Sequence, residues 1–208
     1  MKHLSEFDAS DVAELARADV TRALAEDVGA GDLTAALVDA RRPARARILA
    51  RETAVICGRP WVEEAVRACD PSARLSWQVE EGGRCAADQV VLHIEGNAQA
   101  LLTAERTALN FLQLLSGVAT KTSVFVDAVK GTRAAIVDTR KTIPGLRLAQ
   151  KYAVKAGGGV NHRIGLYDAV LIKENHIAAA GGVAAVLQRV RETAPQARFV
   201  EIEVETLA

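Results

Sequence analysis

The fold is decided by a short apolar run that ends in charged residues, AVLIKENH at residues 169–176. Two runs of the same kind lie on either side of it, AAIVDTRK at residues 134–141 and FVEIEVE at residues 199–205. Segments with helical spacing of apolar residues separate the three runs, at Arg147–Ala156 and Val183–Arg191. Strands that alternate with helices predict parallel pairing through right-handed crossovers, so we expect an α/β fold for this half of the chain.

Charged side chains gather where the expected strands end. The strands at 134–137 and 169–172 run into basic residues, and the strand at 199–204 carries acids at a spacing of two, which places them on one face. The residues concerned are Arg140, Lys141, Lys173, Glu201, Glu203 and Glu205. Ligand and catalytic groups gather at the carboxyl ends of strands in parallel α/β proteins. We therefore expect one pocket that is lined by cations and faces at least one carboxylate.

The stretch from Asp138 to Lys173 is locally basic. It holds seven Lys or Arg residues and two acids, whereas the whole chain balances 26 basic against 26 acidic residues. Such a pocket suits an anion with several carboxylates or phosphates, because guanidinium and ammonium groups make charge-assisted hydrogen bonds to both. We assign Lys151 and Lys155, which lie four residues apart on the expected helix, to a solvated face instead.

Three features of this half each keep two interpretations. The glycines at 157–159 either end a helix in a flexible loop or let His162 and Arg163 approach an anionic ligand. The alternating acids of residues 201–205 lie either on an exposed edge strand or near Lys173, where a carboxylate holds Mg²⁺ or a sugar hydroxyl. His176 either caps the helix that follows it or lines the pocket.

The N-terminal half has the mixed pattern of an α+β domain. We predict a helix over Asp11–Glu26, begun by a capping box of Asp11 and Glu14. A second helix opens at Pro60 and runs through Ala68. Four strands accompany the two helices, at Ala44–Arg51, Thr53–Cys57, Ser72–Val79 and Gln89–Glu95.

A long helical stretch joins the two halves. Residues 99–129 contain almost no helix breaker except Gly117, which predicts two consecutive helices. We place the domain boundary near Ser116, with an N-terminal domain at residues 1–115 and a C-terminal domain at residues 116–208.

Composition excludes several classes of protein. Half of the residues are hydrophobic, a quarter are charged and the formal net charge is zero, so binding to nucleic acid or to an anionic membrane is not indicated. No apolar run approaches the roughly 18 residues that cross a bilayer. The three cysteines at 57, 69 and 85 lack C-x-x-C spacing and predict reduced thiols in a cytoplasmic protein.

Several ordered motifs together resemble one family. They are ERTALN at 105–110, DTRKT at 138–142, GGGVNHR at 157–163 and LIKENH at 171–176, and the likeness runs from EDVGAGD at 26–32 to the end of the chain. This set is similar to the quinolinate phosphoribosyltransferases. The resemblance implies an α/β fold in which an N-terminal sandwich domain precedes an incomplete α/β barrel.

The resemblance also implies an activity and the residues that carry it. Quinolinate would react with phosphoribosyl pyrophosphate in the presence of Mg²⁺, giving nicotinate mononucleotide, pyrophosphate and CO₂. The implied substrate-binding residues are Arg106, Arg140, Lys141, His162, Arg163 and Lys173, and the implied catalytic residues are Lys141 and Glu203. Glu203 would approach the ribose and the metal, with Glu205 as the alternative. In a homodimer, Arg106 would enter the partner subunit's site.

The resemblance leaves other functions open. The chain ends at Ala208, after the third expected strand of the barrel half, whereas members of the family continue through further strands and helices. A C-terminally truncated product is therefore expected, whose own turnover is open. The alternatives are a related phosphoribosyltransferase with another substrate and an inactive fragment of such an enzyme; the several pocket cations favour a substrate with two carboxylates.

Overall fold

The computed structural model describes residues 8–206, which form two compact units. The N-terminal unit contains residues 8–138 and 142–161, and the C-terminal unit contains residues 139–141 and 162–206. The chain therefore passes between the units three times, after Asp138, after Lys141 and after Asn161. Among the described residues, none of the helices combines the length and the apolarity that crossing a bilayer requires.

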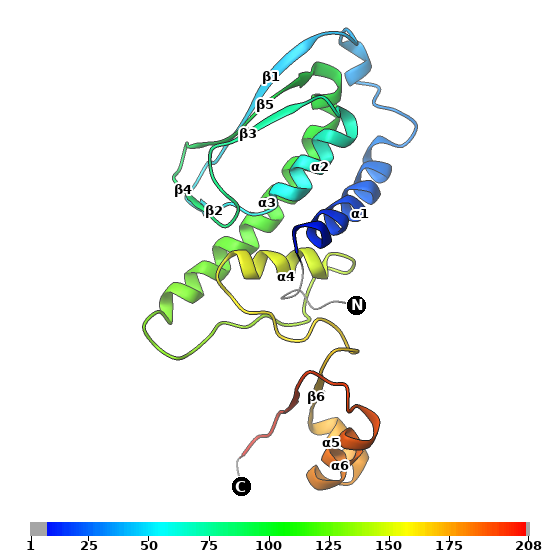
Figure 1. Ribbon diagram of the computed structural model, residues 1–208, viewed down its shortest axis with the longest axis vertical. Helices are drawn as coiled ribbons and strands as arrows, with labels where there is room; N and C mark the ends of the chain where they lie inside the picture. The colour runs from blue at the N-terminus through cyan, green and yellow to red at the C-terminus, as the bar shows by residue number, and fades with distance from the viewer. Residues whose placement is uncertain (1–7, 207–208) are drawn as a thin grey trace. The chain divides into compact units, whose positions relative to one another are not determined.

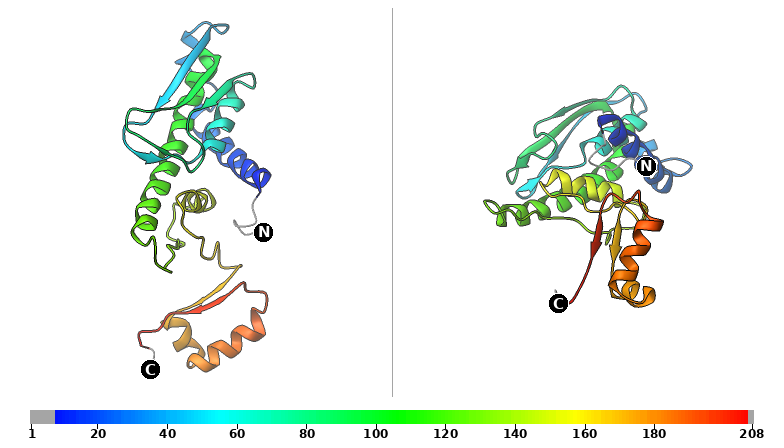
Figure 2. Two further views of the ribbon diagram at one scale, coloured as in Figure 1. Left: turned by 60° about the vertical axis from the view of Figure 1, so that its left-hand side comes forward. Right: turned by 60° about the horizontal axis from the view of Figure 1, so that its bottom comes forward.

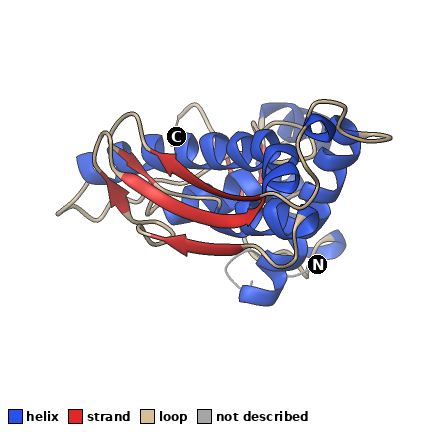
Figure 3. Cartoon of the chain, turned by 90° about the horizontal axis from the view of Figure 1, so that it is seen from above, coloured by secondary structure: helices blue, strands red, loops and turns tan. Residues whose placement is uncertain are grey.

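The N-terminal unit is a sheet covered by helices (Figure 1). Strands β1, β5 and β3 form an antiparallel sheet in that order, and β2 pairs antiparallel with β4. Figure 3 shows the sheet lying against the helices, which leaves its other face open. The elements are α1 (Ala9–Val28), the short 3₁₀ helix η2 (Ala35–Leu37), β1 (Pro43–Leu49), β2 (Ala54–Val55), α2 (Arg59–Cys69), β3 (Arg74–Trp77), β4 (Arg84–Cys85), β5 (Val90–Asn97), α3 (Ala98–Ala128) and α4 (Arg147–Ala156).

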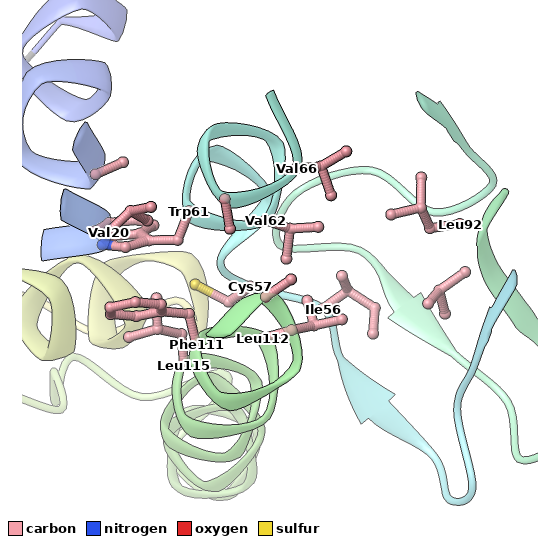
Figure 4. Packing of buried hydrophobic residues seen from close by; sticks show 14 of the residues in the cluster. Val20, Ile56, Cys57, Trp61, Val62, Val66, Leu92, Phe111, Leu112 and Leu115 are labelled. Atoms are coloured by element: carbon pink, nitrogen blue, oxygen red, sulfur yellow. The ribbon is translucent and has the colours of Figure 1, made fainter. Parts of the chain in front are cut away.

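The core of this unit lies where α2 crosses α3 (Figure 4). Trp61 of α2 is fully buried; its ring centroid lies 6.4 Å from that of Phe111 and 5.3 Å from that of Tyr152. Its indole N–H donates a 2.9 Å hydrogen bond to the buried carboxylate of Asp19 on α1. A buried indole needs such a partner, so this bond fixes α1 against α2.

The predicted start of α1 is wrong by a few residues. Asp8 is the N-cap, and its carboxylate accepts hydrogen bonds from the backbone N–H groups of Ser10 and Asp11. The Asp11 carboxylate accepts in return from the N–H of Asp8 at 2.9 Å. The capping box therefore joins Asp8 to Asp11, and Glu14 lies inside the helix. The prediction failed because Asp11 suits both positions of a box in sequence.

The predicted break at Gly117 is also wrong, since α3 runs unbroken from Ala98 to Ala128. One glycine costs a helix only about 1 kcal/mol relative to alanine. Buried neighbours on both sides outweigh that cost, among them Leu115 and Ala119. The Ser116 hydroxyl also accepts from the Cys57 N–H at 3.0 Å and donates to its carbonyl at 3.1 Å. The domain boundary near Ser116 stays a prediction; the helix passes through it without interruption.

The C-terminal unit is a parallel strand pair backed by two helices. Strands β6 (Val170–Ile172) and β7 (Val200–Ile202) pair in parallel, with Leu171 in register with Glu201. Helices α5 (Glu174–Ala180) and α6 (Val183–Thr193) lie on one side of the pair (Figure 2). The predicted alternation of strand and helix, and the parallel pairing, are confirmed.

The first of the three expected strands, at residues 134–137, is reduced to one bridge. Val137 pairs in parallel with Val160 in the N-terminal unit. Among the described residues, this bridge does not extend into a strand. The partner residue Val160 directly follows three glycines, and the bridge ends there. The apolar pattern predicted a strand over four residues, but only Val137 takes part in a bridge.

Candidate active site

Most of the predicted site residues lie in the C-terminal unit. Arg140 lies in the short segment 139–141, His162 and Arg163 precede β6, and Lys173 follows it directly. Arg140, His162, Arg163 and Lys173 are each partly buried, and the Nε atom of Arg140 is fully covered. Partly buried cations are held in place by their surroundings and lose part of their hydration, which prepares them to bind an anion.

Glu201 of β7 and Glu203, which directly follows the strand, contact two of these side chains. The Lys173 ammonium donates to Glu203 at 2.8 Å, and His162 Nε2 lies 2.9 Å from a carboxylate oxygen of Glu201. Glu201 and Glu203 are two residues apart, so their side chains lie on the same face of the chain. The Glu203 N–H also donates to the carbonyl of Ile172 at 2.9 Å, which extends the pairing to the residue beside Lys173.

Arg163 shows that the charges converge. Partial burial, followed by the nearby positive charge of Arg140, lowers the pKa of the Arg163 guanidinium from its ordinary value. Asp168, Glu201 and Glu203 oppose this shift. A guanidinium stays protonated at any ordinary pH, so the effect on Arg163 is crowding of like charge rather than loss of charge. An anion placed between Arg140 and Arg163 would relieve that repulsion.

Local hydrogen bonds hold the loop that follows Arg163, residues 164–168, in its conformation. The Asp168 carboxylate accepts from the N–H groups of Ile164 at 2.8 Å and Gly165 at 2.9 Å. The His162 ring packs edge-on against Phe199, with ring centroids 4.8 Å apart. Asp168 is one of the two acids of the locally basic stretch, and in sequence only its position three and four residues after the two N–H donors suggests this role.

His176 makes the capping contact that one of its two interpretations predicts. Its Nδ1 accepts a 3.0 Å hydrogen bond from the backbone N–H of Lys173. His176 therefore caps the first turn of α5 and fixes the backbone that carries the Lys173 side chain.

Glu201 and Glu203 both have partners, but they do not form a complete metal site among the described residues. Glu201 and Glu203 remain about half exposed while they contact His162 and Lys173. Among residues 8–206, no group of three or more His, Cys, Asp or Glu side chains lies close enough to hold a metal. Mg²⁺ is often bound by one or two carboxylates and completed by substrate phosphates and water, and this pair of acids fits that pattern. Glu205 is exposed beyond the end of β7.

Two further predicted residues lie apart from these contacts. Lys141 is exposed, and its backbone N–H donates to the Thr139 hydroxyl at 3.1 Å. Arg106 belongs to the N-terminal unit, where it is exposed on α3 and lines a hollow of about 200 Å³ together with Glu26 and Asn110. The entry of Arg106 into a partner's site stays a prediction.

The prediction for Lys151 is wrong. Its side chain is 1% exposed and forms an ion pair with Asp138, whose side chain is 6% exposed. Lys155, one turn later on α4, is exposed as expected. Residues four apart share a helical face in general, but α4 is covered at Lys151 and open at its last turn. The sequence offered no signal that separates the two lysines.

The glycines at 157–159 serve packing in the N-terminal unit. Gly157 is the C-cap of α4, and a Cβ there would meet the Ala119 carbonyl and lie 2.9 Å from Thr122 Cβ. A Cβ at Gly159 would lie 2.7 Å from a Val154 methyl. The small residues therefore let this turn pass close to α3, in addition to ending α4.

Comparison with known proteins matches both halves of the chain to the same family. The family model for the N-terminal domain of quinolinate phosphoribosyl transferase matches residues 32–116, and the model for its C-terminal domain matches residues 118–208. A nicotinate-nucleotide pyrophosphorylase (carboxylating) of Mycobacterium leprae is 46% identical, over 97% of this chain and 70% of that protein. A probable enzyme of the same name from Synechocystis is 42% identical, over 88% of this chain and 62% of that protein.

A solved structure agrees with these family and sequence matches. The nicotinate-nucleotide pyrophosphorylase of Francisella tularensis superimposes with a TM-score of 0.91 at 39% identity, covering all of this chain and 72% of that one. The chain thus spans between 62% and 72% of the length of these three proteins.

Proposed function

The chain belongs to the quinolinate phosphoribosyltransferase family, and from this premise we propose that it serves phosphoribosyl transfer to quinolinate. In the proposed reaction, quinolinate and phosphoribosyl pyrophosphate give nicotinate mononucleotide, pyrophosphate and CO₂. The observation that carries the proposal is the convergence of Arg140, Arg163 and Lys173 in one unit, with Glu203 paired to Lys173.

The cations suit the charge of this substrate. Quinolinate carries two adjacent carboxylates, and its transfer from water needs more than one positive partner. Arg140 and Arg163 repel each other in the absence of an anion, so they gain more from a dicarboxylate than two isolated arginines would. Lys173 supplies a third charge on the same unit; Lys141 and His162 complete the set of substrate-binding residues.

Glu203 is proposed to act at the ribose. The bond from the ribose carbon to the pyrophosphate oxygen breaks, its electron pair leaves with pyrophosphate, and positive charge develops on the sugar. A carboxylate close to that charge stabilises it. Mg²⁺, when bound through Glu203 and the substrate phosphates, supplies neutralising charge for the departing pyrophosphate. We propose Lys141 as a second catalytic residue, because it is exposed, follows Arg140 directly in the sequence and carries an ammonium that can bind a phosphate.

The later step needs electrostatics rather than a nucleophile. The quinolinate ring nitrogen donates its electron pair to the ribose carbon and becomes a pyridinium. The carbon–carbon bond to the neighbouring carboxylate then breaks, CO₂ leaves, and the electron pair remains on the ring carbon until a proton arrives. The cationic nitrogen stabilises that carbanion, so the protein's main contribution is to position both substrates.

Other parts of the proposal concern assembly and location. We propose a homodimer in which Arg106, exposed on α3, reaches the partner subunit's site. The three cysteines are free thiols in the structure, which supports a cytoplasmic location.

A phosphoribosyltransferase for a monocarboxylate such as nicotinate is the second candidate, and titration calorimetry separates the two. The chain is titrated with quinolinate, with phthalate, which keeps both carboxylates but lacks the ring nitrogen, and with nicotinate. We expect quinolinate and phthalate to bind at least about tenfold more tightly than nicotinate, because each carboxylate–cation contact contributes more than 1 kcal/mol. Nicotinate binding as tightly as quinolinate would favour the second candidate, and no binding of any of the three would indicate an inactive fragment.

A further inference from the structure

A buried ion pair in the N-terminal unit is used by no step of the proposed reaction. The Lys151 ammonium donates to one carboxylate oxygen of Asp138, and both side chains are almost completely buried. The Asn161 amide donates to the other Asp138 oxygen at 2.7 Å and to the backbone carbonyl of Lys151 at 2.8 Å. We name Asp138, Lys151 and Asn161 the anchor.

The anchor joins two chain segments that already lie side by side. Val137 and Val160 form a parallel bridge, in which the Asp138 N–H donates to the Val160 carbonyl at 3.1 Å. The Val160 N–H donates to the Ile136 carbonyl at 2.8 Å. Two backbone bonds are a short pairing, and one residue of slippage would send the following side chains to the opposite face. The side chains of the anchor therefore supply the specificity of register that this pairing lacks.

Each segment continues directly into the candidate site. Arg140 follows Asp138 by two residues, and Arg163 follows Asn161 by two residues. Partial burial and then the positive charge of Arg140 lower the pKa of Arg163, so the two guanidinium groups lie close enough to repel each other. We propose that Lys151 is a positioning residue: by holding Asp138 and Asn161 together from α4, it keeps Arg140 and Arg163 at the spacing that a dianion needs. This inference rests on the proposed function for the identity of the dianion.

A purely stabilising role is the weaker explanation of the anchor. Burial of an ion pair removes hydration from both charges, so apolar residues of similar volume are often at least as stable. Directed contacts between charged and amide groups instead specify a single geometry. A lysine that only strengthened the fold would be replaceable together with its partner, whereas one that sets register would not.

The test uses three variants of the whole chain. Lys151→Met removes the ammonium, and Lys155→Met is the matched control on the exposed turn of the same helix. The double variant Asp138→Leu/Lys151→Met replaces the pair by apolar side chains. Three quantities are measured for each: the dissociation constant for quinolinate by calorimetry, hydrogen exchange of residues 136–141 and 159–163 by mass spectrometry, and the thermal midpoint.

The proposal makes a distinct prediction for each variant. Lys151→Met weakens quinolinate binding by about tenfold or more and accelerates exchange in both segments but not in β1 and β5. Lys155→Met stays within about twofold of the parent chain in both quantities. The double variant has a thermal midpoint closer to that of the parent chain than Lys151→Met has, and it keeps the weak binding and the fast exchange.

Two results would overturn the positioning role. One is a Lys151→Met variant with unchanged affinity and unchanged exchange in both segments. The other is a double variant that regains affinity together with thermal stability, which would make the anchor a stabilising contact only. If the parent chain binds no quinolinate, the proposed function fails, and the exchange of the two segments alone decides whether Lys151 holds their register.

Discussion

Replacement of Lys173 by methionine separates a binding role from a stabilising one. Lys173 Nζ lies 2.8 Å from a Glu203 oxygen, and the two side chains are 45% and 47% exposed. Ion pairs that are this exposed contribute about 0–1 kcal/mol to stability, because water and salt screen them. Methionine keeps the length of the side chain. We therefore expect Lys173→Met to lower the free energy of unfolding by less than about 1 kcal/mol.

The same change should have a much larger effect on the ligand. A hydrogen bond between an ammonium and a carboxylate contributes about 1.5–3 kcal/mol, which corresponds to about 10- to 150-fold in affinity. Loss of Lys173 also leaves the Glu203 charge unbalanced beside the ligand's carboxylates, and this repulsion acts in the same direction. The dissociation constant for quinolinate should therefore rise by at least about tenfold.

Urea denaturation and titration calorimetry measure the two effects on the same preparation. Lys130→Met, an exposed lysine of the N-terminal unit, is the control for loss of one positive charge. The reasoning is refuted if Lys173→Met loses more than about 2 kcal/mol of stability, or if its affinity stays within about twofold of the Lys130→Met control.

Two further predictions concern the N-terminal unit. Gly157→Ala should destabilise the chain by about 1–3 kcal/mol or more in urea denaturation, because its methyl group meets the Ala119 carbonyl. Gly117→Ala, with open space around the new methyl group on α3, should stabilise by about 0.5–1 kcal/mol; the same sign for both variants would contradict the packing described for the glycine turn. Hydrogen bonds from the Ser72 hydroxyl, and then from the Asn97 N–H, hold the pKa of Asp70 below its ordinary value of 3.8. The stabilisation is fully present above the unfolded-state pKa and is lost as the pH falls through the lower folded-state pKa. The difference in unfolding free energy between the parent chain and Asp70→Asn should therefore shrink below about pH 4 in denaturation curves. A difference that does not depend on pH would contradict this role.

The sequence predicted local structure best where one signal dominated. The bounds of α4 agree with the prediction at both ends, because apolar spacing and the following glycines point to the same helix. The parallel order of β6 and β7 followed from the alternation of strand and helix. The break at Gly117 failed because packing on both sides of one glycine decided the outcome, and sequence spacing carries no information about that packing.

The site was predicted by residue type more than by geometry. The motifs named Arg140, Arg163 and Lys173, but the pairing of Lys173 with Glu203 depends on the register of β6 with β7. Lys151 was assigned to the wrong environment, because helical spacing relates it to Lys155 and says nothing of the covering segments. The sequence therefore did not reveal the contacts between residues that are distant along the chain, and these contacts determine the geometry of the site.

The central claim is that Arg140 and Arg163 bind one dianion together. The most direct measurement is a titration with quinolinate, followed by the NMR signals of the arginine side-chain Nε–H groups, with Arg140→Lys and Arg163→Lys variants to assign them. The account predicts that both signals shift along one binding curve and that either substitution weakens binding for both. Quinolinate that binds while neither signal moves, or that moves one without the other, would contradict it.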